Sequence, residues 1–207
     1  MNVGRRGLLP YRYYNAVIGI ILVNGVIFVL SLAIRFLPFE LALIPPRLIQ
    51  GYWWTSITYF FVHSPGSIYH ILLNMLGLLW FGAPVERNIG SNEFLLFYLI
   101  SGVCSGLFAS LFSLNSPVAI IGASGAVFAV MLSYAAIFPD SVIYLFWFFP
   151  TRAPVAVLIF AGISVFGTLT GFQAGISHLT HLGGFIVGFF YVWIRLGVNP
   201  LNSFFHR

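Results

Sequence analysis

Long apolar runs constrain the fold of this chain more than any other feature of its sequence. Only 6% of the 207 residues are charged and 60% are hydrophobic, whereas a soluble domain carries about 25% charged residues. A chain of this composition cannot cover its surface with polar groups. The sequence therefore predicts an all-α protein that crosses a membrane several times. Its length suits one bundle without a second domain.

Six apolar segments can be assigned as membrane-spanning helices. The expected spans are 14–37, 68–85, 94–114, 124–138, 154–169 and 178–194. They define a six-helix membrane domain over residues 14–196, with short tails at 1–13 and 197–207. The longest connection, 38–68, is rich in aromatic side chains typical of the membrane–water interface, so we expect it to lie partly in the membrane. The apolar segment 142–149 is too short to cross, and we expect it at the surface.

The basic residues predict an orientation. All nine are arginines. If the N-terminus is cytoplasmic, seven lie in inner segments and only Arg35 and Arg47 lie in outer ones, in agreement with the positive-inside rule. We therefore expect both termini in the cytoplasm and the protein in the plasma membrane. The arginines are scattered rather than clustered, which argues for the lipid bilayer and against nucleic acid as a partner.

Four polar residues are placed at similar depth by this orientation. The second, fourth and sixth spans all begin on the outer side, and a helix rises about 1.5 Å per residue. Each of these spans carries unusual polar side chains in its first turns, namely His70, Asn74, Ser124 and His181. They lie within reach of one another if the three helices are neighbours.

Small residues on two of these spans favour that arrangement. Glycines permit two helices to approach closely, and the fourth and sixth spans carry Gly122, Gly125, Gly184 and Gly188. Close approach brings a serine hydroxyl within hydrogen-bond distance of an imidazole. The sequence therefore predicts contact between the serine of the fourth span and the histidine of the sixth.

This pair indicates nucleophilic catalysis, because serine needs an adjacent base to become a good nucleophile. Other hydrolytic centres are excluded: the chain has no lysine, one aspartate and no His-Glu-x-x-His motif. No acidic residue is placed to orient His181, so we expect a dyad. The candidate oxyanion donors are His70, Asn74 and the Ser124 backbone N–H. His178 lies one turn from His181, but a third ligand is missing, so neither metal nor cofactor is expected.

Together these residues resemble the motifs of the rhomboid family of intramembrane serine proteases. The matching segments are Gly122-Ala123-Ser124-Gly125 as G-x-S-G, His181 to Gly188 as H-x-x-G-x-x-x-G, His70 to Asn74 as H-x-x-x-N, and Ala83-Pro84-Val85-Glu86 in the connection between the second and third spans. The resemblance implies a six-helix rhomboid bundle with Ser124 as nucleophile, His181 as base, and His70 and Asn74 as the oxyanion pair.

The activity that the resemblance implies is a serine endopeptidase. It would cleave transmembrane segments of membrane-protein substrates near the outer side of the bilayer, through an acyl-enzyme. Water must reach such a site, so we expect a hydrophilic cavity with the first loop and the loop at 171–177 at its rim.

Three positions depart from the family pattern. Thr55 follows Trp54 where the family often has arginine, Phe128 stands where many members have tyrosine, and Thr180 replaces a frequent alanine. None of them removes a dyad or oxyanion residue.

The alternative is a catalytically silent rhomboid-like protein that binds transmembrane clients. A small transporter would instead carry internal repeats or charges inside its spans, and the sequence shows neither.

Overall fold

The computed structural model describes residues 8–145, 148–171 and 177–205, and these are mostly helical. Four of the described helices are long and apolar enough to cross a membrane: Ala16–Ala33, Ile68–Ile89, Ser91–Leu111 and Ala153–Thr170. A shorter apolar helix spans Ser124–Ile137. The chain is therefore a multi-pass integral membrane protein.

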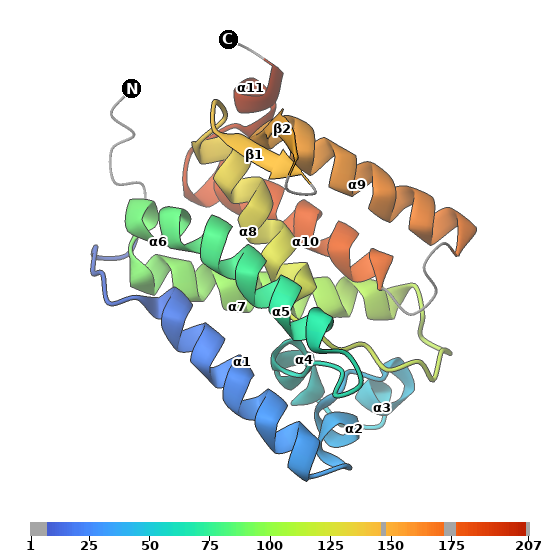
Figure 1. The fold of residues 1–207 in the computed structure, drawn as a ribbon. Helices are drawn as coiled ribbons and strands as arrows, with labels where there is room; N and C mark the ends of the chain where they lie inside the picture. Colours follow the sequence, from blue (N-terminus) through green and yellow to red (C-terminus); the bar gives the residue numbers. More distant parts are fainter. Residues whose placement is uncertain (1–7, 146–147, 172–176, 206–207) are drawn as a thin grey trace.

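The elements follow one another as labelled in Figure 1. Two of the helical segments continue through a π-helical turn, at Leu78–Gly82 and at Tyr191–Arg195. The α-helices and strands are α1 (Ala16–Ala33), α2 (Leu37–Leu41), α3 (Pro45–Ile49), α4 (Thr55–Thr58), α5 (Ile68–Gly77), α6 (Ala83–Ile89), α7 (Ser91–Leu111), α8 (Ser124–Ile137), β1 (Val142–Leu145), β2 (Phe149–Arg152), α9 (Ala153–Thr170), α10 (His178–Phe190) and α11 (Pro200–Phe205).

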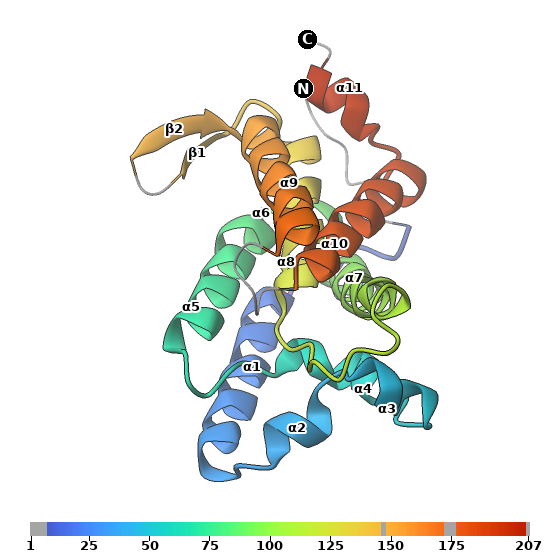
Figure 2. The same cartoon turned by 90° about the vertical axis from the view of Figure 1, so that its right-hand side faces the viewer.

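Helix α8 lies in the middle of the bundle, between α7, α9 and α10 (Figures 1 and 2). Eleven of its 14 residues are buried, which agrees with a helix that is apolar around its whole circumference. Its contact with α10 is made by backbone as much as by side chains. A Cβ on Gly184 would overlap the carbonyl oxygen of Gly125, and one on Gly188 would lie 2.9 Å from Cα of Ala129. Only glycine permits this approach.

The first loop packs on the C-terminal half of α7. Helices α2, α3 and α4 lie together beside the end of α1 (Figure 1). The rings of Tyr59 and Phe60 fill the space above two glycines of α7, and the Tyr59 hydroxyl donates to the carbonyl of Gly102 at 2.6 Å. This part of the chain is therefore fixed against the bundle by buried aromatic side chains.

Two sequence expectations need correction. The all-α prediction is wrong at residues 142–152, where β1 and β2 form an antiparallel hairpin that projects from the bundle (Figure 2). The segment is too short for a spanning helix, and pairing the two strands satisfies its backbone groups. The C-terminal segment is not only a polar tail, because α11 packs Phe204 against the core. Asn199 caps this helix by accepting a bond from the Leu201 amide at 2.9 Å.

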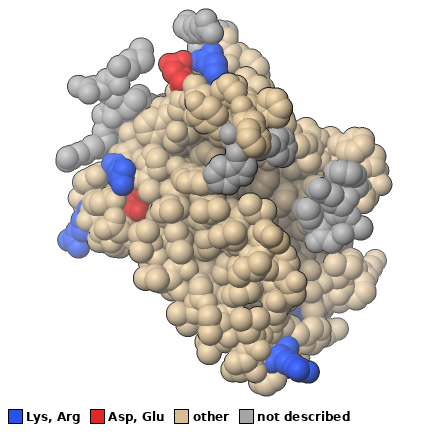
Figure 3. Space-filling view, in the orientation of Figure 1, with Lys and Arg blue, Asp and Glu red and all other residues tan. Residues whose placement is uncertain are grey.

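On the face shown in Figure 3, the charged side chains of the described residues lie toward the ends of the molecule. In Figure 3 a broad middle band of the visible face carries none. At one end the carboxylate of Glu86 accepts bonds from the backbone amides of Ala16 at 2.6 Å and Val17 at 3.0 Å. The hydroxyl of Ser91 also donates to this carboxylate. Glu86 therefore caps the N-terminus of α1, whose first amides have no partner within the helix.

Glu86→Gln is expected to lower the free energy of unfolding by about 2 kcal/mol. The glutamine side chain would place an NH₂ group where one carboxylate oxygen now accepts a bond from a backbone amide of α1. Water cannot replace the lost bond easily, because Glu86 is only 1% exposed. Reversible unfolding in mixed detergent micelles, followed by circular dichroism, measures the loss. Glu40→Gln is the matched control, because the Glu40 side chain is 46% exposed and its ion pair with Arg47 lies at the surface. Equal effects of the two changes would contradict the capping role.

Candidate active site

Ser124 is the first residue of α8, and the segment before it is fixed to the first loop. Ile120 and Leu43 exchange backbone hydrogen bonds at 2.8 and 3.0 Å, and the Gly122 amide donates to the carbonyl of Tyr59 at 3.0 Å. Gly122 has φ +109°, a conformation that favours glycine. The chain therefore turns sharply into α8 and holds Ser124 at the helix start.

The structure brings His181 of α10 to this serine. Nε2 of His181 lies 2.9 Å from Oγ of Ser124, although the two residues are 57 positions apart. Phe128, one turn into α8, stacks on the imidazole with ring centroids 4.2 Å apart and planes 7° from parallel. The phenylalanine thus supplies the flat ring contact without a hydroxyl. The serine hydroxyl and the imidazole are in hydrogen-bond contact.

His70 of α5 lies on the other side of the serine segment. A Cβ on Gly122 would be 2.5 Å from Nε2 of His70, so the ring packs directly on this glycine. Nδ1 of His70 accepts a bond from the Ser64 amide at 3.3 Å. A neutral imidazole that accepts at Nδ1 carries its proton on Nε2. His70 therefore presents an N–H donor at Gly122, two residues before Ser124 in the chain.

Asn74 is buried one turn after His70 and bonds to its own helix. Its Nδ2 donates to the His70 carbonyl at 2.7 Å. Among the described residues, no hydrogen bond joins Asn74 to Ser124 or His181. An amide group carries two N–H donors, and one of them is used in this bond. The structure therefore places Asn74 beside His70 on the same helix, with one N–H of its amide not used in this bond.

His63 is a neighbour of the site that the sequence did not point to, because it lies in a loop and outside any motif. Its side chain is fully buried, and its ring meets that of His70 edge-on with centroids 5.0 Å apart. Among the described residues, neither ring nitrogen of His63 has a hydrogen-bond partner. Burial, together with nearby His70, lowers the pKa of His63 to about 3. His63 is therefore a neutral ring that supports His70.

The carboxylates of the described residues are engaged away from the serine. Glu40 pairs with Arg47, Asp140 with Arg152 and Glu93 with Arg195. In the same described ranges, no three histidine, cysteine, aspartate or glutamate side chains gather as a metal site would require. Of the loop at 171–177, residues 172–176 lie outside the described part, so its predicted place at the rim is not addressed. The imidazole of His181 contacts Ser124 directly, and the imidazole of His70 packs on Gly122.

The protein is thus a helical membrane bundle in which a serine and a histidine meet at the starts of two packed helices, α8 and α10. Residues 50–198 match the family model described as Rhomboid domain. The match covers most of the chain. The chain therefore belongs to the rhomboid family.

Several relatives of known name are similar to this chain. RHOMBOID-like protein 4 of Arabidopsis thaliana is 33% identical over 63% of this chain and 32% of its own length. Rhomboid protease GluP of Bacillus subtilis (strain 168) is 32% identical over 76% of this chain and 29% of its own. Rhomboid protein 1, mitochondrial, of Saccharomyces cerevisiae is 32% identical over 63% and 39%. The chain spans about a third of the length of these three relatives.

Proposed function

We propose that this chain is an intramembrane serine endopeptidase that works through a Ser124–His181 dyad. The observation that carries the proposal is the 2.9 Å contact between Oγ of Ser124 and Nε2 of His181 inside a membrane bundle. A buried hydroxyl in a membrane helix ordinarily bonds back to its own helix, as Ser133 of α8 does with Ala129. Ser124 instead meets a base from another helix, which is the arrangement that activates a serine.

The reaction is acyl transfer to the serine and then to water. His181 takes the proton of Ser124 as Oγ attacks the carbonyl carbon of the scissile peptide, and a tetrahedral intermediate forms. The oxyanion is held by the Nε2–H of His70, the free N–H of the Asn74 amide and the Ser124 backbone N–H. His181 then protonates the leaving amine. It finally activates water, which hydrolyses the acyl-enzyme and regenerates the serine.

The proposed topology has six spans. Beyond the four long helices, α8 and the run from α10 to Arg195 would be the fourth and sixth crossings. A helix of 14 residues is about 21 Å long, shorter than a hydrocarbon core of about 30 Å. Ser124 at its start would thus lie below the outer surface. Both termini would be cytoplasmic, the membrane would be the plasma membrane, and the domain would span 14–196 with tails at 1–13 and 197–207.

The proposed substrates are transmembrane segments of other membrane proteins. A helix shields its carbonyl groups by hydrogen bonding, so a substrate must unwind before Ser124 can attack. Segments that are helix-destabilising and have a small residue at the cut would be preferred. The site would need neither metal nor cofactor, since hydroxyl, imidazole and N–H donors perform each step.

The second candidate is a silent rhomboid-like protein that binds transmembrane clients. It would use the same bundle but would have no need of the contact between Ser124 and His181. The contact therefore favours the hydrolase.

Labelling with a fluorophosphonate probe tests the proposal, because such a probe reacts with an activated serine. Purified wild-type protein in detergent is expected to be labelled, and Ser124→Ala and His181→Ala to lose the label. Ser133→Ala is the matched control, because this serine lies on the same helix and bonds to its own backbone. It should be labelled like the wild type. Folded wild-type protein that remains unlabelled would reject the hydrolase in favour of client binding.

A further inference from the structure

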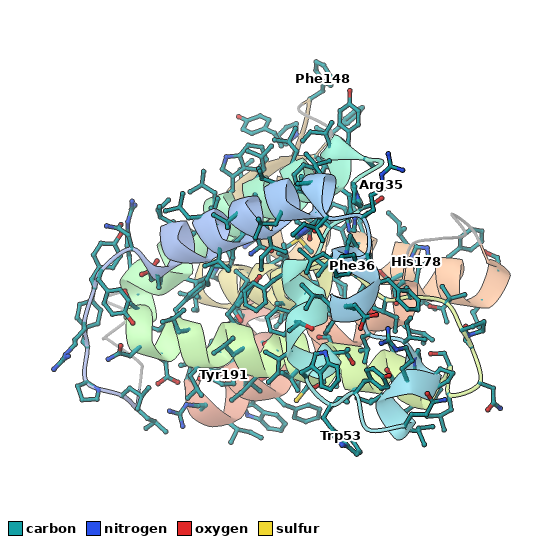
Figure 4. All side chains as sticks on the ribbon, turned by 90° about the horizontal axis from the view of Figure 1, so that it is seen from below. Arg35, Phe36, Trp53, Phe148, His178 and Tyr191 are labelled. Carbon is teal, nitrogen blue, oxygen red and sulfur yellow. The ribbon has the colours of Figure 1, made fainter. Side chains whose placement is uncertain are left out.

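His178 joins the candidate active site to a neighbouring helix. It is the first residue of α10, one turn before His181, and it is 6% exposed. Its ring meets the His181 ring nearly at right angles, with centroids 5.9 Å apart and an interplanar angle of 84°. Figure 4 shows His178 near the end of α9. A buried imidazole thus lies next to the histidine that contacts Ser124.

A notch in α9 seats this ring. A Cβ on Gly167 would overlap Nε2, Cδ2 and Cε1 of His178, so the imidazole rests on the glycine backbone. Gly162, earlier on the same helix, has nothing within 4 Å of its would-be Cβ. Any side chain at position 167 would therefore occupy the space that the His178 ring fills. Through this contact the outer end of α9 determines where the His178 ring lies.

The imidazole of His181 needs such support because no carboxylate holds it. Phe128 stacks on its face, but a parallel stack permits the ring to slide or turn within its own plane. The His178 ring stands nearly perpendicular to the imidazole at a centroid distance of 5.9 Å, so it limits the space in which the imidazole can turn. A misplacement of about 1 Å can lower a catalytic rate by about 100-fold. A turn of the His181 ring within its own plane, which the Phe128 stack permits, would carry Nε2 away from Oγ of Ser124.

We infer that His178 is a positioning residue for His181, held in place by the Gly167 notch of α9. The inference rests on the proposed hydrolase function. His178 would not touch the substrate or the reacting atoms. Its role is to restrict the His181 ring, so that the geometry of the serine–histidine contact depends on how α9 packs at its outer end.

Four variants test this role by the second-order rate of fluorophosphonate labelling, measured on protein shown to be folded by gel filtration and circular dichroism. His178→Leu removes the planar ring and is expected to slow labelling about 10-fold. His178→Phe keeps a ring and should restore the rate to within about threefold of the wild type. Gly167→Ala displaces the ring and should slow labelling like His178→Leu. Gly162→Ala is the matched control on the same helix and should have no effect.

The double variant separates positioning from general damage. Gly167→Ala combined with His178→Leu should label no more slowly than either single variant, because both changes remove one contact. With a transmembrane substrate, kcat should fall while KM stays unchanged. Labelling of His178→Leu at the wild-type rate, or equal losses for His178→Leu and His178→Phe, would overturn the inference and leave the hydrolase intact. Absence of labelling in the wild type would instead reject the proposed function.

Discussion

His181→Ala is expected to lower kcat for cleavage of a transmembrane substrate by on the order of 10⁴-fold or more, and adding Ser124→Ala should lower it no further. In the proposed mechanism the two side chains act as a unit, since the 2.9 Å contact between Nε2 and Oγ would make the hydroxyl nucleophilic. Loss of either partner therefore removes the whole effect. Cleavage of a fluorescently labelled transmembrane peptide in proteoliposomes measures both rates.

The non-additivity distinguishes a dyad from two independent contributions. Independent residues would give a double variant slower than either single one, by the product of the two losses. Ser133→Ala, on the same helix as Ser124, serves as the control and should cleave at the wild-type rate. A His181→Ala protein that retained a tenth of the wild-type kcat would contradict the assignment of His181 as base.

Gly184→Ala is expected to have the largest effect on stability, a loss of about 3 kcal/mol at the upper part of the range for overpacking. The added methyl group would overlap the carbonyl oxygen of Gly125, and backbone cannot move aside as the tip of a side chain can. Helices α8 and α10 must separate. Reversible unfolding in mixed detergent micelles measures this loss, and labelling of Ser124 should fall with it because the same contact holds His181 in place.

Gly19→Ala provides the comparison for this prediction. Gly19 lies within α1, and nothing lies within 4 Å of a Cβ built on it. Alanine is the better helix former, so the free energy of unfolding should stay the same or rise by up to about 1 kcal/mol. Similar losses for Gly19→Ala and Gly184→Ala would show that the helix contact at Gly184 is not tight.

The sequence predicted the structure best where a short motif determines how two helices pack. Spacing and span order placed Ser124 and His181 near each other, because two small-residue faces can pack in few ways. The ends of the helices were less predictable. The second span continues to Ile89 through a π-helical turn, where the expectation stopped at 85, since local hydrophobicity does not define where backbone bonding ends.

Other contacts between distant segments could not be read from the sequence. The sequence places Glu86 in the connection between the second and third spans, but its binding to the start of α1 depends on how the two helices dock. His63 is similar, since only the packed loop shows that its ring supports His70. The seat of His178 on Gly167 likewise requires the relative position of α9 and α10.

The cap of α1 by Glu86 has a consequence for synthesis of the protein. The carboxylate that completes the first helix lies 70 positions after the amide of Ala16. A ribosome that adds about 5–20 residues per second needs roughly 4–14 s to supply it. Helix α1 is thus synthesised before its own N-terminal partner exists. Its leading amides lack the Glu86 carboxylate in that interval, and this cap of α1 can form only after α6 has been translated.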